Sequence, residues 1–167
     1  MIIVSLGTHE RNFFRLVKEI EKLIQQNKIR ERIIIQLGYT KYKIKGAECY
    51  DFIPFDKMIR YIRDSSVMIT HGGVGSIMDA LSFGKVPIVV PRRKELDEHS
   101  DDHQMQITKE MEKRGLIIPV YEINDLENAI EKVRKFKIKK IEKKKSKILN
   151  SIDKKLKEWE KNETCSY

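Results

Sequence analysis

Short runs of β-branched and other apolar residues alternate along the chain with longer amphipathic segments. This alternation is typical of a parallel sheet covered by helices. The runs predicted as strands are Ile2–Leu6, Arg32–Leu37, Cys49–Ile53, Val67–Thr70, Val86–Val90 and Leu116–Val120. The run from Val86 to Val90 is apolar on both faces, as expected for a central strand with helices on each side.

Apolar residues also recur at helical spacing, which predicts a first helix over residues 12–26 with one buried face. Further helices are predicted over residues 75–83, 102–114 and 124–135, and Gly84 and Gly115 would form left-handed caps at two of their ends. We therefore expect an α/β fold, a Rossmann-like three-layer domain with a parallel sheet. Ligands of such sheets bind beyond the carboxyl ends of the strands, so candidate chemistry is sought there.

The charge of the chain is unevenly distributed. The 167 residues carry a net charge of +9, but residues 1–131 hold 20 basic and 20 acidic side chains, whereas residues 132–161 hold 14 basic and 4 acidic ones. Apolar residues recur at three- and four-residue intervals in the basic part, at Ile148, Leu149, Ile152, Leu156 and Trp159. We expect a domain over residues 1–134 and a basic amphipathic C-terminal helix or tail over residues 135–167.

Several classes of protein are disfavoured by composition. No stretch approaches the roughly 18 apolar residues of a membrane span, and the start of the chain lacks the features of a signal peptide. We expect a cytoplasmic protein. Cys49 and Cys165 are far apart and cannot form a zinc site alone.

The segment from Thr70 to Asp79 runs from an apolar strand through a glycine cluster into a helix. Its glycines are Gly72, Gly73 and Gly75, and they allow the backbone to approach a ligand closely. Free N–H groups at the start of the helix attract phosphate, with help from His71 and Ser76. The segment matches neither the P-loop nor the dinucleotide-binding motif, but it predicts a phosphate-binding site.

The end of this segment and the turn after the first strand supply further candidate ligand contacts, each with an alternative. Asp79 lies one helical turn after Ser76 and could reach ribose hydroxyls, or it could only complement the helix dipole. Gly7, Thr8 and His9 end the first strand, where Thr8 and His9 could contact a ligand; alternatively, Thr8 or Asn12 could cap the following helix and His9 could be exposed to solvent.

His103 and Gln104 begin another predicted helix at the same edge and suit recognition of sugar hydroxyls. A metal site is the alternative for the histidines and carboxylates of this region, but they show no recognised ligand spacing.

The order and spacing of these motifs resemble the glycosyltransferase family 28 C-terminal domain, the nucleotide-sugar-binding half of GT-B glycosyltransferases. The motifs are Gly7-Thr8-His9, Phe52-Ile53-Pro54-Phe55, His71 to Ser76 with Asp79, Gly84-x-x-Pro87, Pro91, His103-Gln104 and Gly115. The chain is too short for both lobes of a GT-B enzyme, so the resemblance is to the free-standing donor-binding subunit of two-component transferases. These include bacterial exopolysaccharide and capsule transferases and the eukaryotic dolichol-linked N-acetylglucosaminyltransferase. The opening Val4 to Glu10 looks most like the bacterial members.

The resemblance implies a role for each matching residue. His71, Gly72, Gly73, Gly75 and Ser76 would contact the diphosphate of a UDP-sugar, Asp79 the ribose, the backbone of Ile53 the uracil, and His103 and Gln104 the sugar, beside Gly7, Thr8 and His9. His103 replaces the acidic residue of many relatives. The helix start would stabilise the leaving group, so no metal and no cofactor are expected. In an inverting enzyme of this kind the base normally lies on the acceptor side; His9 is the local candidate.

The resemblance also implies partners. A membrane-anchored acceptor-binding subunit would bring a lipid-linked saccharide, which would place this chain peripherally at the inner face of the membrane. The basic tail would dock on that subunit, rest on an anionic membrane surface or fold back on its own domain. The alternative functions are an enzyme like the UDP-sugar epimerases and a nucleic-acid-binding protein acting through the tail. The neutral domain lacks interleaved aromatic residues, so nucleic acid is not an expected partner.

Overall fold

The structure is a computed structural model that describes residues 1–135. The chain divides into the units Met1–Phe136 and Lys137–Tyr167. The predicted C-terminal helix lies outside the described residues. No helix within residues 1–135 is long and apolar enough to cross a membrane.

The first unit is a six-stranded sheet in which every pairing is parallel. The strands are β1 (Ile2–Ser5), β2 (Ile33–Gln36), β3 (Glu48–Tyr50), β4 (Val67–Thr70), β5 (Ile88–Val89) and β6 (Ile118–Pro119). Their spatial order is β3-β2-β1-β4-β5-β6, the order of the Rossmann fold. Every residue of β1, β2, β4 and β5 is buried, which confirms the prediction that the run from Val86 to Val90 forms a strand covered on both faces.

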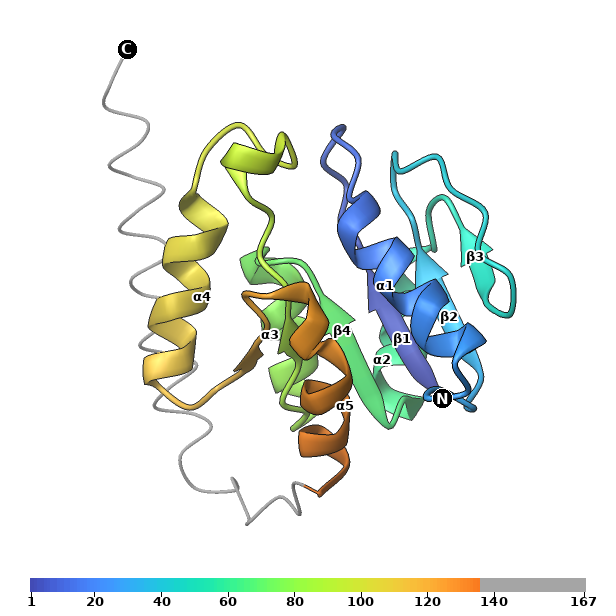
Figure 1. Ribbon diagram of the computed structural model, residues 1–167. Coiled ribbons are helices and arrows are strands. Elements are labelled where there is room, and N and C mark those ends of the chain that lie inside the picture. The colour runs from blue at the N-terminus through green and yellow to red at the C-terminus, as the bar shows by residue number, and fades with distance from the viewer. Residues whose placement is uncertain (136–167) are drawn as a thin grey trace. The chain divides into compact units, whose positions relative to one another are not determined.

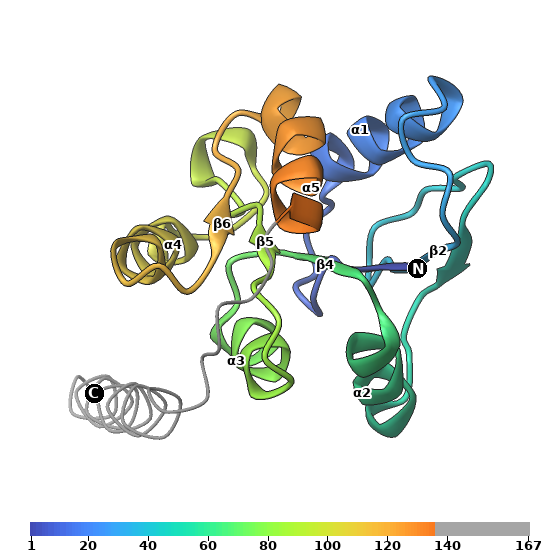
Figure 2. The ribbon, with the colours of Figure 1, turned by 90° about the horizontal axis from the view of Figure 1, so that it is seen from below.

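Helices cover both faces of this sheet. The helices are α1 (Phe14–Gln25), α2 (Phe55–Asp64), α3 (Val74–Ser82), α4 (His103–Lys113) and α5 (Leu126–Lys135), with short 3-10 turns η1 (Lys94–Leu96) and η2 (Ile123–Asp125). Figures 1 and 2 show α1 and α5 on one face, α2 and α3 on the other, and α4 beside β6. The predicted α/β three-layer fold is therefore confirmed.

Most element boundaries lie within a few residues of the predicted ones. Gly84 and Gly115 adopt φ angles of +71° and +66° after α3 and α4, so the predicted left-handed caps are confirmed. The third strand begins and ends earlier than predicted, at Glu48 and Tyr50.

The sequence prediction missed helix α2. This helix begins after Pro54, where proline sets the backbone for a helix start. On its inner side, Ile62 is buried and packs with Ile3, Ile34 and Met68 in the core between the sheet and the helices α2 and α3. The helix also provides the crossover that brings the chain from β3 to β4, which pairs with β1.

Replacing Ile62 with alanine tests this packing. Ile62 is 1% exposed, so Ile62→Ala should leave a cavity and lower the free energy of unfolding by about 3 kcal/mol. The matched control is Ile59→Ala on the same helix, where the side chain is half-buried and the loss should be less than half as large. Urea unfolding followed by circular dichroism measures both, and equal losses would contradict the placement of α2.

Candidate functional site

A fully buried arginine connects the segments that follow β1 and β5. Arg92 is 1% exposed, and its guanidinium donates hydrogen bonds to backbone carbonyls rather than to a carboxylate. Nη2 donates to the carbonyl of Leu6 (2.8 Å), and Nη1 donates to those of Arg11 (2.8 Å), Glu98 (3.0 Å) and Asn12 (3.4 Å). One side chain thus holds the turn after β1 against the turn after β5.

The same guanidinium puts a positive charge beneath the carboxyl edge of the sheet. Its carbon lies 4.7 Å from the centre of the Phe13 ring, which covers it on one side. Burial lowers the pKa of Arg92 to about 10, while Glu98 opposes the shift. The group remains charged at neutral pH, and its field acts on the histidines around it.

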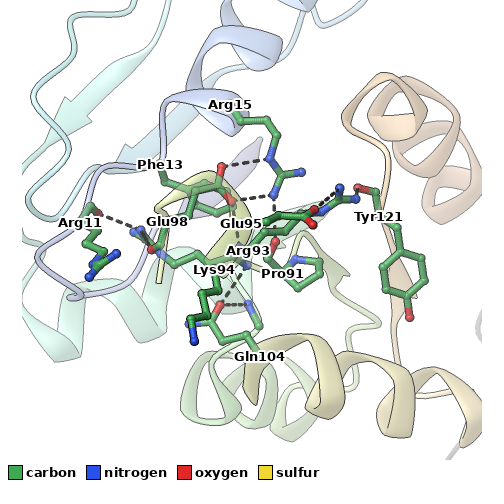
Figure 3. A network of polar contacts seen from close by, with 12 residues as sticks. Arg11, Phe13, Arg15, Pro91, Arg93, Lys94, Glu95, Glu98, Gln104 and Tyr121 are labelled. Atoms are coloured by element: carbon green, nitrogen blue, oxygen red, sulfur yellow. Dashed lines mark hydrogen bonds and ion pairs between the residues drawn. The ribbon is translucent and has the colours of Figure 1, made fainter. Parts of the chain in front are cut away.

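Glu98 ties the segment after β5 to helix α1. Its carboxylate accepts two hydrogen bonds from Arg15, from Nε (3.0 Å) and Nη2 (2.9 Å), and one from the backbone N–H of Arg93 (3.1 Å). Arg15 also donates to the carbonyl of Pro91 (2.9 Å). Figure 3 shows this network. The long polar segment from residue 92 to 102 is therefore anchored at its middle.

His71 follows β4, and its imidazole lies between two glycines. A Cβ atom added to Gly7 would come within 2.5 Å of the ring, and one added to Gly73 would overlap Nε2. Glycine is therefore required at both positions, and Gly7 additionally has a φ of +79°. Burial, followed by the charge of nearby Arg92, lowers the pKa of His71 to about 4, so the ring is neutral at physiological pH.

Gln104, at the start of α4, holds the glycine turn in place. Its Oε1 accepts hydrogen bonds from the backbone N–H groups of Gly72 (3.0 Å) and Arg92 (3.2 Å). A Cβ on Gly72 would lie 2.7 Å from Cβ of Gln104, so this glycine allows α4 to approach closely. Gln104 is 7% exposed, and its side-chain oxygen holds the backbone of Gly72 next to that of Arg92. Its predicted contact with a sugar remains a prediction, as does that of neighbouring His103.

The start of α3 presents backbone donors with open space beside them. The first hydrogen bond within the helix is made by the N–H of Ile77 to the carbonyl of Gly73, so the N–H groups of Val74, Gly75 and Ser76 precede the helical ladder. A Cβ built on Gly75 meets no atom within 4 Å. Packing in the described domain therefore does not require glycine at position 75, although an approaching ligand would.

Asp79 lies one turn further along α3. Its side chain is half-buried, and no hydrogen bond or ion pair within residues 1–135 involves its carboxylate. Burial raises the pKa of Asp79. A carboxylate that is partly desolvated and without a protein partner is well suited to accept hydrogen bonds from ligand hydroxyls.

The turn after β1 does not cap α1 through Thr8, which is exposed. The N–H of Phe13 donates instead to Oγ1 of Thr40 (3.0 Å), a buried residue from the segment after β2. His9 is half-buried and stacks on His99, with ring centroids 4.3 Å apart. Thr8 and His9 are thus available at the edge of the sheet where His71 lies.

The backbone N–H of Ile53, the predicted uracil contact, already donates a hydrogen bond within the protein. This N–H donates to Oε1 of Gln36 (3.0 Å). Beside it, Tyr39 and Phe52 are about half exposed and pack edge to face at 5.4 Å. Phe52 directly precedes Ile53, so these two rings place exposed aromatic surface beside the predicted base contact.

A pocket of about 520 Å³ lies between the start of α1 and the segment around η1. It is lined by Arg11, Asn12, Phe14, Arg15, Leu96, Asp97 and Glu98. None of the predicted ligand contacts lines it, although Arg11 and Glu98 belong to the polar network that also includes Arg92. Within residues 1–135, no group of three His, Cys, Asp or Glu side chains is arranged to hold a metal ion.

Sequence reasoning missed the role of Arg92, and it considered Glu98 and His99 only as members of the alternative metal site. Arg92 and Glu98 looked like members of a polar loop because their partners lie some 80 residues away in the sequence. The only local signal was an arginine immediately after an apolar strand and a proline, at Pro91-Arg92.

Comparison with known proteins now identifies the family. The model of the glycosyltransferase family 28 C-terminal domain matches residues 1–159. The chain belongs to this family. This family 28 chain is also similar to the UDP-N-acetylglucosamine transferase subunit ALG13 of Yarrowia lipolytica. The two are 42% identical over 82 residues, which cover 48% of this chain and 40% of the relative. The subunit of the same name from Candida albicans is 30% identical over 93 residues, 56% of this chain and 30% of the relative.

Solved structures share the fold of this family 28 domain. The glycotransferase of kitacinnamycin has a TM-score of 0.62 at 17% identity, covering 80% of this chain and 34% of its own. The calicheamicin glycosyltransferase CalG4 has a TM-score of 0.58 at 16% identity, and the match covers 81% of this chain and 34% of CalG4. The chain spans 30 to 40% of the length of the two curated relatives described above.

Replacing Arg92 with methionine tests its structural role. Arg92→Met keeps much of the volume but leaves buried carbonyls without donors, so the free energy of unfolding should fall by about 2 to 4 kcal/mol. Arg63→Met, at an exposed pair with Asp64, should change it by less than about 0.5 kcal/mol. Chemical denaturation compares the two variants; equal effects would show that Arg92 does not join the two segments.

The low pKa of His71 predicts a loss of stability in acid. The unfolded chain binds a proton at His71 below about pH 6.5, whereas the folded chain does so only below about 4. The free energy of unfolding should therefore fall by roughly 2 to 3 kcal/mol from this group between pH 7 and 4.5. Burial also lowers the pKa of His9, so this group also lowers the free energy of unfolding as the pH falls.

The measurement is urea unfolding at several pH values for the wild type and His71→Asn. The variant lacks the titrating ring, so its stability should depend less on pH over this interval, even if it is less stable at pH 7. If the free energy of unfolding of the wild type and of His71→Asn changed equally with pH, a neutral, buried His71 would be contradicted.

Proposed function

We propose that this chain is the donor-binding, catalytic subunit of an inverting glycosyltransferase that uses a UDP-sugar. The observation that carries the proposal is the start of α3, where the N–H groups of Val74, Gly75 and Ser76 precede the helical ladder and a Cβ built on Gly75 meets no atom of the described residues within 4 Å. This arrangement suits a diphosphate, because backbone donors and the helix dipole favour negative charge at a helix start. Membership of the glycosyltransferase family 28 C-terminal domain and similarity to subunits named as UDP-N-acetylglucosamine transferases support a UDP-sugar as the ligand.

The residues around α3 suit the separate parts of such a donor. Ser76 and the glycine turn at Gly72 and Gly73 would hold the phosphates, while the unpaired carboxylate of Asp79 would accept hydrogen bonds from the ribose. Tyr39 and Phe52, beside Ile53, offer aromatic surface to the uracil. His103 and Gln104 at the start of α4 would contact the sugar. Thr8 and His9 would contact the donor from the same edge of the sheet.

The reaction requires the protein to stabilise UDP as the leaving group. Negative charge grows on the diphosphate as the anomeric C–O bond breaks, and the α3 N–H groups are preorganised to receive it. Neutral His71 neither repels nor neutralises this charge, and Arg92 adds positive potential from below. This chain's residues can perform this part of the reaction without a metal ion.

The partner of the proposed enzyme would be a membrane-anchored subunit that binds a lipid-linked saccharide, which would place the chain at the inner face of the membrane. The word subunit in the names of the similar ALG13 proteins supports a multi-chain enzyme. A role in capsule or exopolysaccharide assembly rests on the opening residues Val4 to Glu10. Docking through the basic segment around Ile152 and Trp159 stays a prediction, as does a contribution from anionic lipid.

Calorimetric titration with UDP tests the proposed function. The wild-type chain should bind UDP, and Gly75→Ala should weaken binding at least tenfold, because the added methyl group occupies the space through which phosphate approaches. The same change should keep or raise thermal stability, since alanine favours helices by about 0.5–1 kcal/mol over glycine.

Asp79→Asn should also weaken UDP binding, through weaker hydrogen bonds to the ribose. The matched control is Asp64→Asn, at the exposed end of α2, which should bind UDP like the wild type. A folded wild-type chain that binds no UDP would refute the proposal.

A further inference from the structure

A buried glutamine with an unbonded amide nitrogen lies at the carboxyl edge of the sheet. Gln36 is the last residue of β2 and is 8% exposed. Its Oε1 accepts the hydrogen bond from the backbone N–H of Ile53 (3.0 Å). Its Nε2 carries two N–H donors, and no hydrogen bond within residues 1–135 involves them. Because buried polar groups are normally bonded, these two donors are available to a ligand.

The contact with Ile53 fixes the direction in which the amide group points. Turning the amide over would place Nε2 against the Ile53 N–H, and two donors cannot bond to each other. Gln36 therefore faces a ligand as a hydrogen-bond donor. Its Nε2 is also accessible, because the inaccessible side-chain nitrogens without a partner among the described residues are Arg15 Nη1, Arg92 Nε and Arg93 Nε.

The backbone of Ile53 supplies a complementary acceptor. No hydrogen bond within the described part of the chain reaches the carbonyl oxygen of Ile53. The ladder of α2 starts one residue later, where the carbonyl of Pro54 accepts from the N–H of Met58 (2.9 Å). Nε2 of Gln36 and the carbonyl of Ile53 thus form a donor–acceptor pair on two residues that a hydrogen bond already joins.

This donor–acceptor pair lies on the sheet face that also carries the start of α3. Ile34 packs with Ile3 and Met68 in the core beneath α2 and α3, and Gln36, two residues further along β2, faces the same side. Figure 2 shows α2 and α3 together on this face. Since β1 separates β2 from β4, the ends of β2 and β4 are about 10 Å apart, a span that suits a nucleoside from its base to its phosphate.

We propose that Gln36 determines which base the protein accepts: Nε2 donates to O4 of uracil while the carbonyl of Ile53 accepts from N3–H. The inference rests on the proposed function. Among pyrimidines, only uracil and thymine carry an acceptor, O4, beside a donor, N3–H. Cytosine has the reverse arrangement, which would set donor against donor and acceptor against acceptor. Buried polar groups left unpaired in this way reject the wrong ligand strongly.

The aromatic surface beside Ile53 has a separate task. The exposed rings of Tyr39 and Phe52 can cover the flat face of a base, but such contacts scarcely distinguish one pyrimidine from another. Discrimination therefore falls to the donor–acceptor pair at the edge of the base.

Calorimetric titration of the full chain with UDP and CDP, at about pH 8, tests the inference. The wild type should bind UDP at least about tenfold more tightly than CDP. Gln36→Glu keeps an oxygen for the Ile53 N–H, and this bond favours the ionised carboxylate. The second carboxylate oxygen is an acceptor, which repels O4 of uracil and suits the amino group of cytosine. The ratio of the two affinities should therefore fall at least about tenfold.

The matched control is Gln106→Glu on the exposed face of α4, which should keep the wild-type ratio. A purely structural role of Gln36 would weaken UDP and CDP binding by the same factor, because the two ligands differ only in the base. An unchanged ratio in a folded Gln36→Glu chain, or equal affinities in the wild type, would overturn the inference. Absent UDP binding by the wild-type chain would refute the proposed function instead.

A second measurement uses the wild type alone and does not depend on the folding of a variant. In a ¹H–¹⁵N correlation spectrum, the Nε2 protons of Gln36 should move downfield when UDP is added, as expected for a donor that gains an oxygen acceptor. The side-chain amide protons of Gln106 should stay in place. Unmoved Gln36 protons at saturating UDP would overturn the inference.

Discussion

The arrangement of the candidate site depends on one buried cation. Where a parallel strand ends, its last carbonyl groups lose their partners in the sheet, and those buried near Arg92 cannot turn to water. The Arg92 guanidinium supplies the missing donors to Leu6, Arg11 and Glu98 at once. A lysine ammonium has no planar fork and could not reach all of them in one conformation. The segments after β1 and β5 are therefore fixed relative to each other before any ligand binds.

The buried cation also determines the electrostatics of the edge. His71 and His9 lie in its neighbourhood, and burial together with the charge of Arg92 lowers the pKa of both rings. Protonating these rings would add positive charges to a partly desolvated cluster, so they remain neutral. Positive potential for an anionic ligand then comes from Arg92 and the α3 start, neither of which changes charge near neutral pH. The neutral rings are left free to act as hydrogen-bond donors and proton acceptors.

The sequence predicted the elements whose signals are local. All six strands, four of the five helices within residues 1–135 and the caps at Gly84 and Gly115 follow from periodicity and glycine chemistry, as does the glycine turn from Gly72 to Gly75. Helix α2 was missed although Phe55, Met58 and Ile62 have helical spacing.

The connections between segments could not be predicted. Phe13 finds its N–H acceptor at Thr40, Gly72 finds Gln104, and Arg92 finds Leu6, all across tens of residues in the sequence. Such pairs depend on which strand ends meet at one edge, and that is a property of the strand order. The sequence therefore identified the residues that carry backbone donors and ligand-binding side chains, but it did not reveal which buried groups hold them in place.

The histidine pair illustrates how backbone geometry can orient two side chains in the same way. Each ring turns Nδ1 back towards the residue two positions later, Arg11 for His9 and Asp101 for His99. In both turns the backbone N–H of that later residue donates to Nδ1, at 3.2 Å for His9 and 3.3 Å for His99. Both rings therefore take their orientation from the turns that carry them, and their contact depends on how the segments after β1 and η1 are held together.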